Sequence, residues 1–216
     1  VGMNMLGISY AFGYGCIEDK EEGFKWIRTA AERGIAEFEY NLGCLYQQGL
    51  GTESDSGEAY VWYEKAAEKG IIDAIGSMGT IYLEAKTYSK AVPLLRQAAE
   101  KGYSNSQLGL GICYYYGLGV EQNNTKGYKW IQNAADQGNA DAQYFLGTLY
   151  YQGEKVEQNF DKASAWFQRA ADQGNANAQT FLGTCFYYGK GVEQDYVKAV
   201  NWFRKAAIQE NEIAQS

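Results

Sequence analysis

The chain has 216 residues, with 19 lysines and arginines against 26 aspartates and glutamates, a formal net charge of −7 and a hydrophobic share of 46%. This composition is typical of a globular chain that can bury a core. The sequence contains no histidine, which excludes Ser-His-Asp and Cys-His triads and histidine-bearing zinc sites. The acidic balance argues against nucleic-acid binding, which needs clustered lysine and arginine, and no apolar run is long enough to insert into a membrane.

Three series of residues recur along the chain with a step of 36 positions, shortened once to 32. The first series consists of Ala-Ala doublets at 30–31, 66–67, 98–99, 134–135, 170–171 and 206–207. The second consists of a Leu or Met followed by Gly, at Gly7, Gly43, Gly79, Gly111, Gly147 and Gly183. The third is a bulky side chain: Trp26, Trp62, Leu94, Trp130, Trp166 and Trp202. A fixed period of this length indicates a repeat architecture.

Each repeat is predicted to form two helices. In 139–174, for example, apolar residues follow helical spacing from Ala142 to Tyr150 and again from Ala163 to Ala170, with Gly153 and Gly174 as stops. The second helices are predicted to start after six N-cap residues: Asp19, Asp55, Thr87, Asn123, Asn159 and Asp195. In the third, shorter repeat, Pro93 predicts a helix that starts late or kinks.

The glycines of the second series lie inside predicted helices, where each costs about 1 kcal/mol relative to alanine. Their constant phase predicts that another helix crosses closely there, with the Ala-Ala doublets as the matching small surface. The tryptophans are predicted to lie in the core.

At these residues the sequence resembles the Sel-one-like repeat family, within the tetratricopeptide-like superfamily. The unit with Ala178, Leu182-Gly183, Phe186, Gly189, Gly191-Val192, Asp195, Lys198-Ala199, Trp202 and Lys205-Ala206-Ala207 carries the resemblance. The resemblance implies an all-α fold: a right-handed α/α superhelix, or solenoid, of six antiparallel helix-pair repeats. It also implies a scaffold or adaptor that binds a protein or peptide in a concave groove lined by the first helix of each repeat.

We expect a single repeat array over 1–216. Its units are 1–34, 35–70, 71–102, 103–138, 139–174 and 175–210, and 211–216 resembles the start of a seventh. Because neither end carries the polar cap that stacked repeats need, we expect the sequence to be a piece of a longer array.

No residue pattern predicts catalysis, a metal site or a cofactor. The acidic residues at the loop–helix junctions complement helix N-termini, and the Gly-x-Gly turns lack the rest of a phosphate loop. The four cysteines, Cys16, Cys44, Cys113 and Cys185, make no metal spacing and lack the pairing within repeats that secreted members of the family use. Free thiols are therefore expected, which favours a reducing, cytoplasmic compartment over a periplasmic or secreted one.

The partner-binding residues are predicted from the tetratricopeptide register, on first-helix positions that packing does not use. Tyrosine, asparagine, glutamine and threonine dominate these positions, where a solvated helix face normally carries lysine and glutamate. The predicted residues are Tyr40, Gln47, Asn105, Tyr115, Tyr116, Tyr144, Thr148, Tyr151, Asn177, Thr180, Thr184 and Tyr187. In an alternative interpretation, these tyrosines pack between neighbouring first helices.

The favoured hypothesis is a non-enzymatic protein–protein interaction scaffold. One alternative is an enzyme-like module that recognises cell wall or β-lactams, although no cluster of nucleophile and base supports it. The other is a structural spacer or self-association array.

Overall fold

The computed structural model describes residues 9–10 and 19–215, with side chains up to 209. Between residues 19 and 215 the chain forms helices and no strand, so the predicted all-α fold of helix pairs is confirmed. The helices are α2 (Lys20–Ala31), α3 (Ala36–Gln48), α4 (Ser56–Glu68), α5 (Ile72–Glu84), α6 (Tyr88–Glu100), α7 (Ser104–Tyr116), α8 (Asn124–Asp136), α9 (Ala140–Gln152), α10 (Phe160–Asp172), α11 (Ala176–Tyr188) and α12 (Tyr196–Gln215). Gly7 and Cys16, on which two of the predictions fall, lie outside the described residues.

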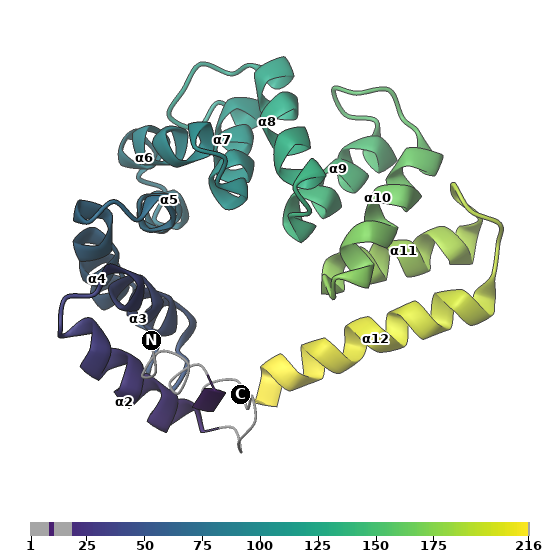
Figure 1. The fold of residues 1–216 in the computed structure, drawn as a ribbon. Coiled ribbons are helices and arrows are strands. Elements are labelled where there is room, and N and C mark those ends of the chain that lie inside the picture. The colour runs from purple at the N-terminus through teal and green to yellow at the C-terminus, as the bar shows by residue number, and fades with distance from the viewer. Residues whose placement is uncertain (1–8, 11–18, 216) are drawn as a thin grey trace. The chain divides into compact units, whose positions relative to one another are not determined.

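The chain forms two compact units, Val1–Gly109 and Leu110–Ser216. In the first unit α3 packs on α4 and α5 on α6, and α4 also contacts α5 (Figure 1). In the second unit α9 packs on α10 and α11 on α12, while α10 contacts α11. Each helix pair therefore buries its apolar side against its own partner and against the next pair.

All six second helices start directly after the predicted N-cap residue. Five predicted N-cap side chains accept a hydrogen bond from a backbone N–H of the following first turn: Asp19, Asp55, Asn123, Asn159 and Asp195. Thr87 also stands directly before its helix, but its side chain makes no cap hydrogen bond, and its Oγ1 donates to the Ala85 carbonyl at 3.3 Å. The tight turn of the shortened repeat holds Thr87 at ψ 61°, outside the extended backbone that lets the other side chains reach forward. Because helix α6 begins at Tyr88, the late start predicted from Pro93 is wrong.

The helical glycines lie under a crossing helix, as predicted, but the group they face differs from the prediction. A Cβ atom built on Gly147 would lie 2.5 Å from the ring carbons Cδ1 and Cε1 of Phe167, and one on Gly43 would lie 2.6 Å from the Tyr63 ring. The crossing helix thus presents a large side chain to the glycine. The Ala-Ala doublet, three residues further along, is buried separately: Ala170 and Ala171 are 0% and 2% exposed.

The tryptophans are half-buried, so their predicted place in the core is wrong. The side chain that fills the core is the next residue, such as Tyr63 after Trp62 and Phe167 after Trp166, with exposed fractions of 1% and 0%. One face of the Trp62 and Trp202 rings carries the ammonium group of Lys65 and Lys205, at 3.7 and 4.0 Å from the ring centroid.

The Gly-x-Gly loops join the two helices of one repeat and contact the repeat before it. Gly191, at φ +68°, lies so close to the backbone of Phe160 that a Cβ atom would overlap it, and Gly51 lies on the Lys20 backbone in the same way. Ser164 Oγ donates to the Gly191 carbonyl at 2.8 Å. The loop of one repeat is therefore fixed to the start of the second helix of the repeat before it.

The last helix runs further than the repeat pattern predicts. Helix α12 continues to Gln215, through most of the residues expected to open a seventh unit. Glu210 stands where Gly174 ends the preceding second helix, so the chain lacks the residue that favours a left-handed stop there.

Candidate functional site

The twelve predicted partner-binding residues, which we call the first-helix face, lie on α3, α7, α9 and α11. They differ widely in exposure. Because the two compact units are separate bodies, the part of the face in each unit is described on its own.

In the first unit, two of these residues hold a helix pair together. The Tyr40 ring packs against that of Tyr63 on α4, with centroids 5.6 Å apart, and Tyr63 Oη donates to Gln47 Oε1 at 2.7 Å. The pKa of Tyr40 is raised, mainly by burial and to a smaller extent by the nearby Cys44 thiol. Asn105, at the start of α7, is exposed.

In the second unit, Tyr144 and Tyr151 of α9 fill the space between successive repeats. The Tyr144 ring lies 5.7 Å from Phe181 of α11, and the Tyr151 ring lies 5.3 Å from Phe160 and 5.8 Å from Phe181. Both tyrosines are half-buried. For these two residues the structure matches the alternative in which the tyrosines pack between neighbouring first helices.

The smaller polar residues of the face bond to their own helices. The hydroxyls of Thr148, Thr180 and Thr184 each donate to the backbone carbonyl four residues earlier, at 3.1, 3.1 and 2.9 Å. Such a bond uses the hydroxyl proton and leaves the oxygen lone pairs as acceptors. Asn177, in the first turn of α11, is exposed.

Helices α7 and α11 each end in a pair of tyrosines, one buried and one exposed in α7 and both exposed in α11. Tyr115 is 1% exposed, its hydroxyl donates to the Glu154 carbonyl at 3.0 Å, and burial raises its pKa. The neighbouring Tyr116 is 54% exposed. At the end of α11, Tyr187 and Tyr188 are 46% and 63% exposed, with their rings 4.9 Å apart.

Two lysines that the sequence reasoning missed lie at these helix ends. Lys155 Nζ lies 4.4 Å from the Tyr115 ring centroid and donates to the Tyr115 carbonyl at 3.3 Å. Lys190 Nζ lies 4.8 Å from the Tyr151 ring centroid and donates to Tyr151 Oη at 3.1 Å. Within the described part of the chain, neither ammonium group has a carboxylate within ion-pair distance.

Lys155 also has an unusual backbone. It occupies the second glycine position of the Gly-x-Gly loop, where Gly119 and Gly191 stand in other repeats, and it keeps the left-handed conformation at φ +61°. A lysine costs more than a glycine in this conformation. The substitution of lysine for the repeated glycine was the sequence signal for this residue. We refer to Tyr116, Tyr187, Tyr188, Lys155 and Lys190 as the tyrosine–lysine edge.

The other chemical features match a structural role. Cys44, Cys113 and Cys185 are free thiols, and burial raises the pKa of both Cys113 and Cys185 to about 11. Among the residues that the structure describes, no three acidic, cysteine or histidine side chains gather closely enough to hold a metal ion. None of the described helices has both the length and the apolar character needed to cross a membrane.

Comparison with known proteins identifies the repeat. The Sel1 repeat model matches residues 1–35, 36–71, 79–103, 104–139, 140–175 and 176–211. A search of curated proteins gave no match.

Several solved structures share the fold. A Sel1 repeat protein from Oxalobacter formigenes is 30% identical, with a TM-score of 0.78, and the match covers 94% of this chain and 83% of that one. The protective antigen c5321 of uropathogenic Escherichia coli, which has an SLR fold, is 34% identical with a TM-score of 0.68, and the match covers 99% of this chain and 46% of that one. The immunity protein PA5088 from Pseudomonas aeruginosa, at 23% identity and a TM-score of 0.71, shares the fold alone. The chain thus spans just under half the length of the E. coli antigen, and with six repeat matches along its sequence it belongs to the Sel1 repeat family.

Proposed function

We propose that this chain is a non-enzymatic interaction scaffold and that it binds a peptide or protein segment along the first-helix face, with the tyrosine–lysine edge as the main contact in the second unit. Sel1 and related helical repeats commonly serve protein–protein interaction, which supports this class of function. The observation that carries the proposal is the tyrosine–lysine edge itself.

The edge has the chemistry of a binding surface. Exposed tyrosine rings give a large contact area that loses little conformational entropy on binding. Tyr116 contacts the rings of Tyr115 and Phe145, and Tyr187 contacts those of Tyr188 and Tyr196. Their exposed fractions of 54% and 46% still leave surface for a partner. Lys155 and Lys190 supply ammonium groups that can pair with carboxylates of the partner.

The buried members of the face have a different part in the proposal. Tyr115 contacts the Tyr116 ring and Tyr151 accepts a hydrogen bond from Lys190, so these two residues position the edge. Tyr144 packs against Phe167 and Phe181. Substitution of these three tyrosines would test stability more than binding. The test therefore uses only exposed positions.

The experiment selects ligands from a phage-displayed library of random 12-residue peptides on the immobilised chain, and then measures the affinity of the enriched peptides by fluorescence anisotropy. We expect the double variant Tyr116→Ser/Tyr187→Ser to bind these peptides about tenfold or more weakly, because two exposed aromatic anchors are lost. Its helical content should stay unchanged.

The control is Val61→Ser/Ile208→Ser, which also removes two exposed apolar side chains, of 43% and 51% exposure, but from second helices. It should bind like the unmodified chain. Failure to enrich any peptide, or equal binding by the two double variants, would contradict the proposal.

A further inference from the structure

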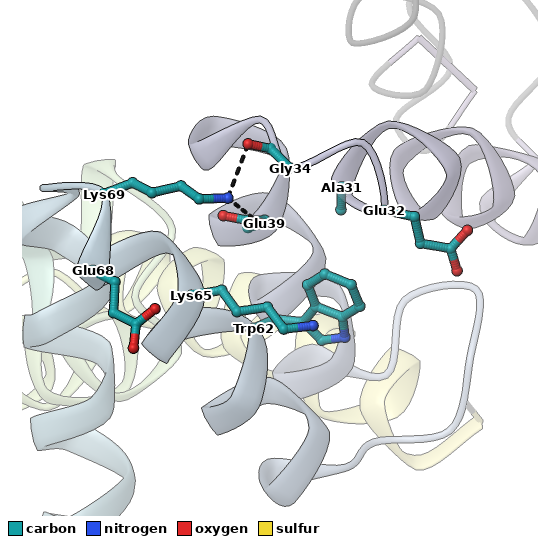
Figure 2. Close-up of a pocket in the computed structure, with 8 residues that line it drawn as sticks. All are labelled: Ala31, Glu32, Gly34, Glu39, Trp62, Lys65, Glu68 and Lys69. Carbon is teal, nitrogen blue, oxygen red and sulfur yellow. Dashed lines mark hydrogen bonds and ion pairs between the residues drawn. The ribbon is translucent and has the colours of Figure 1, made fainter.

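A cavity of about 380 Å³ lies in the first unit, away from the first-helix face. It is formed by the C-terminal end of α2, the turn before α3, the start of α3 and the second half of α4 (Figure 2). Its lining includes both charged and aromatic groups: Glu32, Glu39, Glu68, Lys65, Lys69 and Trp62.

Glu39 is the unusual group of this cavity. The residue is 3% exposed, which is rare for a glutamate. One carboxylate oxygen, Oε1, accepts from Lys69 Nζ at 2.6 Å, and the same ammonium donates to the Gly34 carbonyl at 2.9 Å (Figure 2). The other oxygen, Oε2, is buried and has no hydrogen-bond partner. A buried acceptor without a donor is unfavourable, because it has lost its hydrogen bonds to water.

The other repeats show what normally occupies this position. Three of them have glutamine there, and each glutamine Nε2 donates to the carbonyl of the second alanine in the preceding Ala-Ala doublet: Gln107 to Ala99 at 3.2 Å, Gln143 to Ala135 at 3.1 Å, and Gln179 to Ala171 at 3.3 Å. The ion pair of Lys69 with Glu39 likewise has a neutral counterpart, since Gln173 Nε2 donates to Gln143 Oε1 at 2.8 Å.

The alanine that corresponds to these partners in the first repeat is Ala31, which also lines the cavity. A carboxylate has no N–H, so Glu39 cannot donate to the Ala31 carbonyl as the glutamines do. The repeat therefore presents two acceptors, Glu39 Oε2 and the Ala31 carbonyl, where its neighbours have an internal hydrogen bond.

The remaining lining favours a planar cation. The Trp62 ring already carries a cation on its face, the ammonium of Lys65 at 3.7 Å from the centroid. Lys65 is an exposed side chain on a flexible stem and can leave the ring. Glu32 and Glu68 add two carboxylates to that of Glu39, against the two lysines. A guanidinium group can donate from several N–H groups in one plane and stack on an indole at the same time.

We propose that this cavity binds a guanidinium group, as carried by an arginine side chain. Its N–H groups donate to Glu39 Oε2 and to the Ala31 carbonyl, and its plane lies on the Trp62 ring in place of the Lys65 ammonium. This site is separate from the first-helix face, and its test does not depend on the peptide proposed to bind there.

The experiment titrates the full chain with the blocked peptide acetyl-Gly-Arg-Gly-amide and follows the Trp62 indole N–H by NMR. The resonance is assigned with Trp62→Phe. We expect saturable binding to the unmodified chain and binding about tenfold or more weaker to Glu39→Gln, because the glutamine closes the internal hydrogen bond and removes the charge. Glu39→Gln copies the residue of three other repeats, so it is expected to fold.

The matched control is Glu64→Gln, which removes the same charge from an exposed position of α4 that does not line the cavity. It should bind the arginine peptide like the unmodified chain. Acetyl-Gly-Lys-Gly-amide should bind about tenfold more weakly, since an ammonium cannot stack and reach both acceptors in one plane. Equal binding of the arginine peptide by Glu39→Gln, no saturable binding by the unmodified chain, or equal binding of the lysine peptide would overturn the proposal.

Discussion

Replacement of Gly147 by alanine tests the close crossing of α9 and α10. Alanine favours a helix interior over glycine by about 1 kcal/mol, so an open site would become more stable. Here the new Cβ atom would lie 2.5 Å from two ring carbons of Phe167, about 1 Å inside ordinary contact, and Phe167 is 0% exposed. Overpacking of a buried ring costs about 1–3 kcal/mol. The Phe167 ring is held by Tyr144, Tyr151 and Phe181, so we take the upper end and expect a net loss of about 2 kcal/mol.

Urea unfolding followed by far-UV circular dichroism measures this loss. The matched background is Phe167→Leu, because Leu95 faces Gly79 at the same position of the third repeat, where a Cβ atom would lie 3.0 Å from it. In the Phe167→Leu background, the loss in free energy of unfolding caused by Gly147→Ala should be smaller by at least about 1 kcal/mol than in the unmodified chain. A double-mutant cycle measures this difference as a coupling energy. If Gly147→Ala were as stable as the unmodified chain, or if the two changes were additive, the packing argument would be refuted.

Three further predictions concern caps, turns and thiols. Asn159→Ala should lower the free energy of unfolding by about 1 kcal/mol, whereas Thr87→Ala, which removes no cap bond, should leave it nearly unchanged in the same urea experiment. Lys86→Gly should raise the free energy of unfolding by about 1 kcal/mol, because exposed Lys86 is held at φ +56°. A lower free energy of unfolding would contradict this reasoning. Burial raises the pKa of Cys113 from 9.0 to about 11, so the folded chain keeps a proton that the unfolded chain releases, and the free energy of unfolding should fall as the pH rises from 9 to 11. Cys113→Ala should flatten that fall, and an unchanged slope would show that another group causes it.

The fold could be predicted from the sequence because it depends on features that recur. An N-cap residue such as Asn159 predicts a helix start, and a helical glycine such as Gly147 predicts a close helix crossing. Both kinds of residue recur in all six repeats, so each repeat supports the prediction made from the others. Thr87 marks the start of its helix as predicted but makes no cap hydrogen bond, because the shortened turn does not give it the extended backbone of the other caps. The prediction for Trp62 failed because helical spacing cannot tell the half-buried Trp62 from its fully buried neighbour, Tyr63.

The candidate site was less predictable. The register placed Tyr116 and Tyr115 together on one face, yet Tyr116 is exposed and Tyr115 is buried, with its hydroxyl bonded to the Glu154 carbonyl. Lys155 reaches the same place from the next repeat, and a contact between residues 40 positions apart has no local signature. Glu39 differs from Lys155, because its sequence position can be compared directly with the glutamines of the other repeats. The difference became informative only when the structure showed the hydrogen bonds that those glutamines make.

The contact between the Gly-x-Gly loop and the preceding second helix is made through main-chain atoms on both sides. Lys20 and Phe160 have unlike side chains and still receive Gly51 and Gly191 in the same manner. This main-chain contact therefore does not depend on the chemical character of the residue that opens the second helix. Anyone who recombines these repeats into new modules can exchange that residue without losing the contact, whereas its side chain still matters where it packs, as Phe160 does on Tyr151.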